Sequence, residues 1–259
     1  MRTLDDDALI RIAGSLMNQI KCKVDETGSR GVVLGLSGGI DSALVCHLCS
    51  RTVDTKALLL PEVGLTSDED IDDAVKLCEA LGVDYSKIDI RDMAEMITDS
   101  YPSKLTPGSI PYINIRPRLR MLFLYICANE EKRLVAGTSN MTEVCLGYCT
   151  KWGDNAADFL PIAKLWKTEV IRMAEILGLP KSIIEKRPSA GLYRGQTDEG
   201  ELGASYPVID DILYRYIVEK STLSEIYKDH DKDLIDSIVS RVEKNGHKRS
   251  MPQSLEVDL

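Results

Sequence analysis

The sequence predicts an α/β protein built on a doubly wound parallel sheet flanked by helices. Three short apolar runs, 32–36, 57–60 and 134–136, have strand length and end in small or polar residues. Segments with helical spacing of apolar residues separate them, and this alternation is typical of a parallel sheet covered on both faces. The 259 residues are 44% hydrophobic and 28% charged, which is enough to bury a sizeable core. Because no repeat or composition break divides the chain, we expect one domain over 1–259.

The first half of the chain alternates regularly between helix and strand patterns. Asp5, Asp6 and Asp7 precede apolar residues at helical spacing, and acids are favoured at a helix N-terminus. Gly82 is placed to close a later helix. The expected order is a helix after Asp5, a strand over 32–36, a helix over 43–49, a strand over 57–60, a helix over 68–81 and a strand over 85–90.

The second half contains longer polar segments between its elements. Two of them, 138–158 and 187–207, are rich in Gly and charge, and long polar loops at strand ends are where sites occur. We expect the second, which has four glycines, to form a mobile lid. The expected order is a loop over 101–111, a helix over 118–131, a strand over 134–136, the loop 138–158, a helix over 167–177, the segment 187–207 and helices over 208–219 and 234–242.

Charge and composition exclude several classes of function. The chain has 32 Lys and Arg against 41 Asp and Glu, a net charge of −9, which disfavours a nucleic-acid partner. The N-terminus lacks the pattern of a secretory signal, and the longest apolar stretch, 121–128, cannot span a bilayer. Seven cysteines, an odd number, favour a reducing compartment. We expect a cytoplasmic protein without a membrane partner.

The segment from Ser37 to Ser42, Ser-Gly-Gly-Ile-Asp-Ser, has the features of a phosphate-binding loop. It follows a predicted strand and opens a helix, where free N–H groups and the helix dipole favour an anion. Asp41, an acid beside a phosphate, requires a cation between them, most simply Mg²⁺. No Gly-Lys pair occurs, so this is not a Walker A loop. The alternative is an ordinary glycine turn capped by Asp41.

This hexapeptide resembles the pyrophosphate loop of N-type ATP pyrophosphatases, which cleave ATP between its α and β phosphates to adenylate a substrate oxygen. Further motifs follow in the same order as in the ammonia-dependent NAD synthetase family, and the resemblance runs from about residue 34 to 249. They are 114–121 (NIRPRLRM), 137–143 (GTSNMTE), 147–161 (GYCTKWGDNAADFLP), 197–203 (TDEGELG) and 247–249 (HKR).

The resemblance implies an ATP and metal site. Asp41 and Glu143 match the family's Mg²⁺ ligands. Together with Lys167, they are the expected catalytic residues. Without the resemblance, Glu143 would be interpreted as a solvated loop acid and Lys167 as an exposed helix charge. Ser189 replaces the more frequent threonine and keeps the hydroxyl. The implied ATP contacts are Gly35, Leu36, Ser37, Gly38, Gly39, Ile40, Asp41, Ser42, Thr138, Lys167 and Ser189.

A second set of residues matches the family's contacts to nicotinic acid adenine dinucleotide (deamido-NAD), whose phosphates and carboxylate need cationic partners. Pro117 lies inside the family's Asn-x-x-x-Arg motif, where a proline could shift the neighbouring Arg118. A basic helix end is the alternative for the pair at 247 and 248. The implied contacts are Arg118, Lys151, Asp158, His247 and Lys248.

The implied reaction is the last step of NAD biosynthesis, the ATP-dependent amidation of deamido-NAD. The acid attacks the α phosphate, pyrophosphate leaves, and ammonia then displaces AMP from the acyl adenylate. Asp198 and Glu199 would help to order the lid over this intermediate. Residues 1–259 leave no room for a glutaminase domain, so free ammonia is the expected donor, and a separate glutaminase partner stays open. The family further implies a homodimer with the dinucleotide near the subunit boundary.

The residues also allow three other interpretations. Cys46 and Cys49 form a C-x-x-C pair, and Cys145 and Cys149 lie in the substrate loop, so a metal, redox or sulfur-transfer site competes with buried structural thiols. A nucleotide sensor without catalysis would not need Asp41, Glu143 and Lys167 together. A GMP synthetase-like adenylator is the nearest alternative, against which the 151–158 and 247–248 motifs argue.

Overall fold

Four parallel strands form the centre of the molecule. The computed structural model describes residues 4–189, 191, 197–252, 254 and 255. The strands lie in the order β3-β2-β1-β4. The chain therefore runs from β1 through β2 to β3 on one side of β1, and β4 then pairs with the opposite edge of β1. This reversal creates a switch point at the carboxyl ends of β1 and β4, where loops diverge and ligands bind in open α/β sheets. The strands are β1 (Gly31–Gly35), β2 (Thr55–Leu59), β3 (Asp84–Lys87) and β4 (Arg133–Val135).

Helices cover both faces of the sheet, which confirms the doubly wound prediction. Alternate residues of β1 point to opposite faces. Val32 and Leu34 pack into a cluster with one helix layer, whereas Val33 packs with Cys127 and Ala128 of the other. The first layer contains α1 (Asp6–Thr27), α2 (Ile40–Ser50), α3 (Asp68–Leu81), α8 (Lys167–Ile176) and α9 (Lys181–Ile184), and the second contains α4 (Arg91–Ser100) and α6 (Ile115–Glu131), preceded by α5 (Ile110–Ile113).

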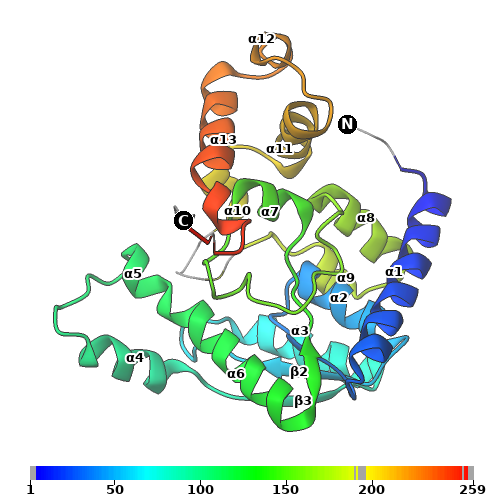
Figure 1. Ribbon diagram of the computed structural model, residues 1–259, viewed down its shortest axis with the longest axis vertical. Helices are drawn as coiled ribbons and strands as arrows, with labels where there is room; N and C mark the ends of the chain where they lie inside the picture. The colour runs from blue at the N-terminus through cyan, green and yellow to red at the C-terminus, as the bar shows by residue number, and fades with distance from the viewer. Residues whose placement is uncertain (1–3, 190, 192–196, 253, 256–259) are drawn as a thin grey trace, which may run out of the picture.

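A separate group of helices has its own apolar cluster. Figure 1 shows α11, α12 and α13 together at the end of the molecule opposite β2 and β3. Leu146 of α7 and Trp166 beside α8 pack into this cluster and connect it to the rest of the fold. The group consists of α7 (Met141–Leu146), α10 (Asp198–Leu202), α11 (Tyr206–Leu213), a π-helical turn (Tyr214–Val218), α12 (Leu223–Ile226) and α13 (Lys232–Lys244), followed by a 3₁₀ turn (Gly246–Lys248).

Capping residues explain several element boundaries. The Asp5 carboxylate accepts a hydrogen bond from Ala8 N at 2.7 Å and begins α1. Gly82 ends α3 in the left-handed conformation, with φ 65°, as its position predicted. α6 begins at Ile115, three residues earlier than expected. Pro117 permits this start because it lies in the first turn of the helix, where a backbone N–H has no partner within the helix.

Helices form inside two segments that were expected to be polar loops. Residues 138–158 were expected to be loop throughout, but α7 forms inside them. Asn140 and Glu143 make a capping box there, each side chain bonding the other's backbone N–H. In 187–207, α10 begins at Asp198, whereas residues 190 and 192–196 of the expected lid lie outside the described residues. The polar composition of both segments did not indicate these helices, because each helix is short and is stabilised mainly by capping hydrogen bonds.

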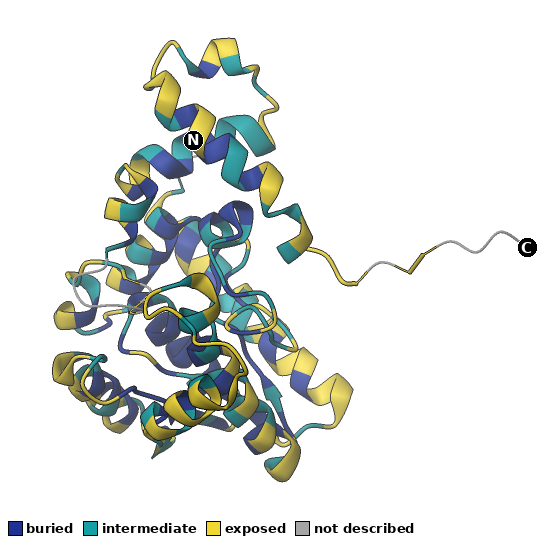
Figure 2. Cartoon of the chain, turned by 90° about the vertical axis from the view of Figure 1, so that its left-hand side faces the viewer, coloured by how far each residue is buried: buried dark blue, intermediate teal, exposed yellow. Residues whose placement is uncertain are grey.

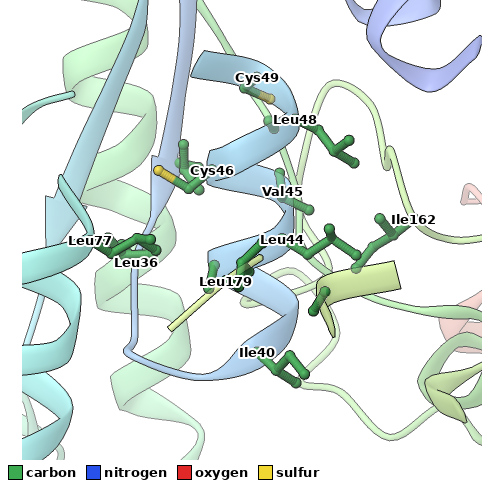
Figure 3. Close-up of a cluster of buried hydrophobic side chains, with 14 of the residues drawn as sticks. Leu36, Ile40, Leu44, Val45, Cys46, Leu48, Cys49, Leu77, Ile162 and Leu179 are labelled. Carbon is green, nitrogen blue, oxygen red and sulfur yellow. The ribbon is translucent and has the colours of Figure 1, made fainter. Parts of the chain in front are cut away.

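Cys46 and Cys49 are packing residues of the core. Figure 3 shows both sulfur atoms among the apolar side chains of α2 and its neighbours, and both residues have no exposed surface. Burial raises the pKa of the Cys46 thiol to about 12 and also raises that of Cys49. The buried-thiol interpretation is therefore confirmed. Figure 2 shows that buried residues lie on the inner faces of the helices, whereas exposed residues lie on their outer faces. No described helix is both long and apolar enough to cross a membrane.

Candidate active site

The phosphate loop joins the carboxyl end of β1 to the start of α2. Gly38 has φ +82°, and a Cβ there would lie 2.3 Å from the Asp70 carbonyl oxygen, so glycine is required. The hydroxyls of Ser37 and Ser42 lie 3.1 Å apart, and Ser42 Oγ donates to Gly39 O at 2.9 Å. No side chain caps α2. The loop is therefore closed on itself and presents a helix N-terminus to an anion, as its sequence predicted.

A buried charge centre lies beside this loop. Lys167, the first residue of α8, is 2% exposed, and its ammonium pairs with the Asp41 carboxylate at the start of α2. Asn140 Nδ2 donates to the other Asp41 oxygen at 2.8 Å. Burial lowers the pKa of Lys167, but the charges of Asp41 and Glu143 outweigh it and raise the pKa above the usual value. The solvated-charge alternative for Lys167 is therefore wrong.

More carboxylates than cations surround Lys167. Burial, followed by the charge of Asp41, raises the pKa of Glu143 well above its usual range. Asp198 is also buried, which raises its pKa, and it accepts hydrogen bonds from Tyr206 Oη at 2.8 Å and Tyr148 Oη at 3.3 Å. Three acids near one ammonium leave a negative surplus. The solvated-loop alternative for Glu143 is wrong as well, since its carboxylate caps a helix and faces this centre.

A buried polar network holds the charge centre in place. Asp210 of α11 has no exposed surface, and its carboxylate accepts from the Thr142 hydroxyl and from Thr168 N at 3.0 Å. Thr142 Oγ1 in turn accepts from Lys167 N at 3.0 Å. The network ties α7, α8 and α11 together around Lys167. Sequence reasoning missed Asn140, Thr142 and Asp210; the Asn-x-x-Glu spacing was a usable signal for the first, whereas no local pattern identified the other two.

Two further predicted ATP contacts occupy less enclosed positions. Thr138 follows β4 at the switch point and is half-buried. Ser189 is exposed, and its Oγ accepts a hydrogen bond from Gly191 N at 3.1 Å. The position of Thr138 agrees with a nucleotide at the loop. The contact of Ser189 with ATP stays a prediction.

The residues expected to contact the second substrate are gathered around the segment 147–158. Arg118, exposed on α6, donates to Lys151 O at 3.2 Å. Asp158 is held beside β4, where its Oδ2 accepts from Val135 N at 2.7 Å. The helix therefore continues through Pro117 without removing Arg118 from this surface.

Lys248 has a contact that the sequence did not reveal. Its ammonium donates to Gly147 O at 2.8 Å and to Cys149 O at 2.7 Å. Gly147 ends α7, so Lys248 does lie at a helix C-terminus, but of α7 rather than of the preceding α13. His247 beside it is exposed. The pair thus adjoins the helix that carries Glu143, and its role toward a substrate stays a prediction.

Comparison with known proteins identifies the family. The family model described as NAD synthase matches residues 12–252. The chain belongs to the NAD synthase family. A curated member from Archaeoglobus fulgidus, an NH(3)-dependent NAD(+) synthetase, is 44% identical over 93% of this chain and 95% of its own. The member of the same name from Thermococcus kodakarensis is 40% identical over 97% and 98%.

Two solved structures share the fold over nearly the whole chain. The NMN synthetase of Francisella tularensis is 34% identical, with a TM-score of 0.87 over 98% of this chain and 100% of its own. The NH3-dependent NAD synthetase of Campylobacter jejuni is 33% identical, with a TM-score of 0.82 over the same shares. The family resemblance seen in the sequence is therefore confirmed.

Proposed function

We propose that this protein is an ammonia-dependent NAD⁺ synthetase, a C–N ligase that amidates deamido-NAD at the expense of ATP. One observation carries the proposal: Asp41 and Lys167 form a buried pair, with Glu143 beside it, at the end of a closed phosphate loop. A binding module does not need a surplus of partly buried carboxylates facing a phosphate site, because they repel the ligand. The names of the relatives supply the substrate class.

The arrangement suits an adenylation followed by an amide synthesis. A carboxylate oxygen of deamido-NAD attacks the α phosphorus of ATP, and the bond to the bridging oxygen breaks to release pyrophosphate. The N–H groups of the loop, the Ser37 and Ser42 hydroxyls and the Lys167 ammonium stabilise the negative charge on the phosphates. Ammonia then attacks the acyl carbon, loses a proton and displaces AMP. Neither step needs a side-chain nucleophile, so catalysis rests on positioning.

The carboxylates of Asp41 and Glu143 would suit a magnesium ion that accompanies ATP. Mg²⁺ usually takes one or two protein carboxylates and completes its shell with phosphate oxygens and water. Asp41 and Glu143 supply such a pair, and the pKa of Glu143, raised first by burial and then by the charge of Asp41, would be lowered by a bound cation. When bound, the ion would neutralise charge on the departing pyrophosphate. We propose these two residues as its protein ligands.

The second substrate is proposed to bind along Arg118, Lys151, Asp158, His247 and Lys248. Arg118 shares one stripe of α6 with Leu122 and Ile126, which are 50% and 51% exposed, at four-residue spacing. Apolar side chains at this exposure are suited to contact with another protein surface. We propose that a second copy of the chain covers this stripe, which would place the dinucleotide beside the dimer boundary. We also propose a cytoplasmic location, where seven free cysteines stay reduced.

The likeness to an NMN synthetase favours a second candidate substrate, the mononucleotide of nicotinic acid. It carries the same reacting carboxylate and lacks the AMP half. The deciding experiment incubates the purified chain with Mg-ATP and either acid, with ammonium or glutamine, and identifies products by mass spectrometry. We expect NAD, AMP and pyrophosphate from the dinucleotide with ammonium alone. Faster turnover of the mononucleotide would select the second candidate, and no amide from either acid would reject the proposal.

A further inference from the structure

Lys186 connects three parts of the chain at the outer side of the phosphate loop. It follows α9, and its ammonium donates to Asp70 Oδ1 and to Asp73 Oδ2, each at 2.7 Å. Both acids lie in the first two turns of α3. The same ammonium donates to Gly38 O at 3.4 Å. None of the family motifs noted in the sequence includes this lysine.

The contact with Gly38 determines which way one peptide group of the loop faces. No described peptide bond is cis, so the Gly38 C=O and the Gly39 N–H point in opposite directions. Lys186 holds the carbonyl from one side, and Gly39 N–H is directed to the other, where it donates to Ser37 Oγ at 3.2 Å. That other side carries the paired Ser37 and Ser42 hydroxyls and faces the expected phosphates.

The surroundings keep the lysine in this position. Asp70 Oδ2 accepts from Ser67 Oγ at 2.6 Å, and Asp73 Oδ1 accepts from Ser182 Oγ at 2.8 Å. Each carboxylate is thus oriented by a second donor. Burial lowers the pKa of Lys186, but the bonds to Asp70 and Asp73 raise it more, so the side chain stays charged. The Asp70 backbone already touches Gly38, which leaves the loop little freedom on this side.

We propose that Lys186 is a positioning residue for ATP, which orients the Gly38–Gly39 peptide so that its N–H faces the nucleotide's phosphates. The nucleotide's identity rests on the proposed function. Lys186 itself acts from behind the loop and would not touch the ligand. Removing it lets this peptide rotate, so an N–H that binds phosphate is replaced in part by a repelling carbonyl.

The test measures Mg-ATP binding by calorimetry without the second substrate, so its outcome does not depend on amide synthesis. K186M should weaken binding about tenfold, the size expected when one hydrogen bond to a charged group is lost. In steady-state assays the KM for ATP should rise by a similar factor while the KM for deamido-NAD stays unchanged. K186R, which keeps a donor and the charge, should recover most of the affinity. K181M, at an exposed lysine of α9, is the matched control.

Hydrogen exchange of the peptide covering 36–44 should be faster in K186M than in K181M. Wild-type ATP affinity in a folded K186M would overturn the proposal, as would equal losses in the KM of both substrates. If K186M fails to fold, K186Q decides, because its amide still donates to one acceptor. A folded K186Q with weakened ATP binding supports the proposal, whereas loss of the fold in both variants would assign Lys186 to stability and overturn it.

Discussion

The two ends of the candidate site are built in contrasting ways. At the ATP end, Lys167 is buried and pairs with Asp41, within a network that reaches the buried Asp210. At the other end, Arg118 and His247 are exposed, and the cations there bond backbone carbonyls rather than acids. Charges interact strongly when buried and weakly in water. The ATP end is therefore organised before any ligand arrives. The other end, called the acid end because the carboxylic acid substrate is proposed to bind there, keeps its cations available for that ligand.

The largest expected effect comes from removing the buried cation. K167M should reduce the rate of NAD formation by about a thousandfold or more, because it removes a preorganised positive charge from the phosphates and leaves three acids facing them. The measurement is steady-state kinetics with saturating substrates. K164M, an exposed lysine three residues earlier, is the control and should stay near the wild-type rate. A K167M rate within tenfold of wild type would contradict the contrast between the two ends.

A smaller and different effect is expected at the acid end. R118A should raise the KM for deamido-NAD about 10- to 100-fold, the value of one or two charge-assisted hydrogen bonds, and leave the KM for ATP unchanged. R11A, at an exposed position of α1, serves as the control. Equal changes in both KM values would mean that the ends are not separate.

A substitution in the exposed stripe of α6, formed by Arg118, Leu122 and Ile126, tests whether a second copy of the chain completes the acid end. I126D should yield a monomer by size-exclusion chromatography with light scattering, because a charge on a buried apolar contact opposes association. We expect the KM for deamido-NAD to rise several-fold, by less than in R118A. I10D, at a similarly exposed residue of α1, should keep the wild-type mass. A monomeric wild type would reject the proposed dimer.

The smallest effect concerns stability of the ligand-free protein as pH changes. The pKa of Glu143 is raised above its ordinary 4.5, so the stability that its protonated form contributes is complete below pH 4.5 and is lost as pH rises through the folded pKa. Each tenfold increase in proton affinity corresponds to about 1.4 kcal/mol. E143Q should flatten this decline in thermal unfolding. Mg²⁺ with ATP should stabilise wild type more at high pH than at low pH, and an unchanged slope in E143Q would contradict the assignment.

Local sequence signals predicted some elements well. The strands around Val33 and Leu58 and the loop from Ser37 to Ser42 were recognisable because runs of apolar residues and a Gly-Gly turn act over a few positions. β3 is shorter than expected and ends at Lys87. α4 was not predicted at all, since it is short and polar on average and only Ala94 of its residues is buried.

The site was predicted in part for the same reason. Glu143 and Lys167 were identified through family motifs, but local composition alone placed both in solvent. Lys167 is buried and Glu143 partly buried because of Thr142, Thr168 and Asp210, which are far apart in the chain and meet only when α7, α8 and α11 pack together. Lys186 was missed similarly, because its partners Asp70 and Asp73 are more than a hundred residues away.

The sequence by itself determined the alternation of strands and helices, the phosphate loop and the family. These depend on periodicity, turn chemistry and short motifs, which act locally. Only the tertiary structure decided that β4 pairs with β1, and hence that Asp41 meets Lys167 at the switch point between them. It also decided which charges are buried and paired and which stay exposed. Burial and charge pairing depend on distances between remote segments, and no local pattern encodes those distances.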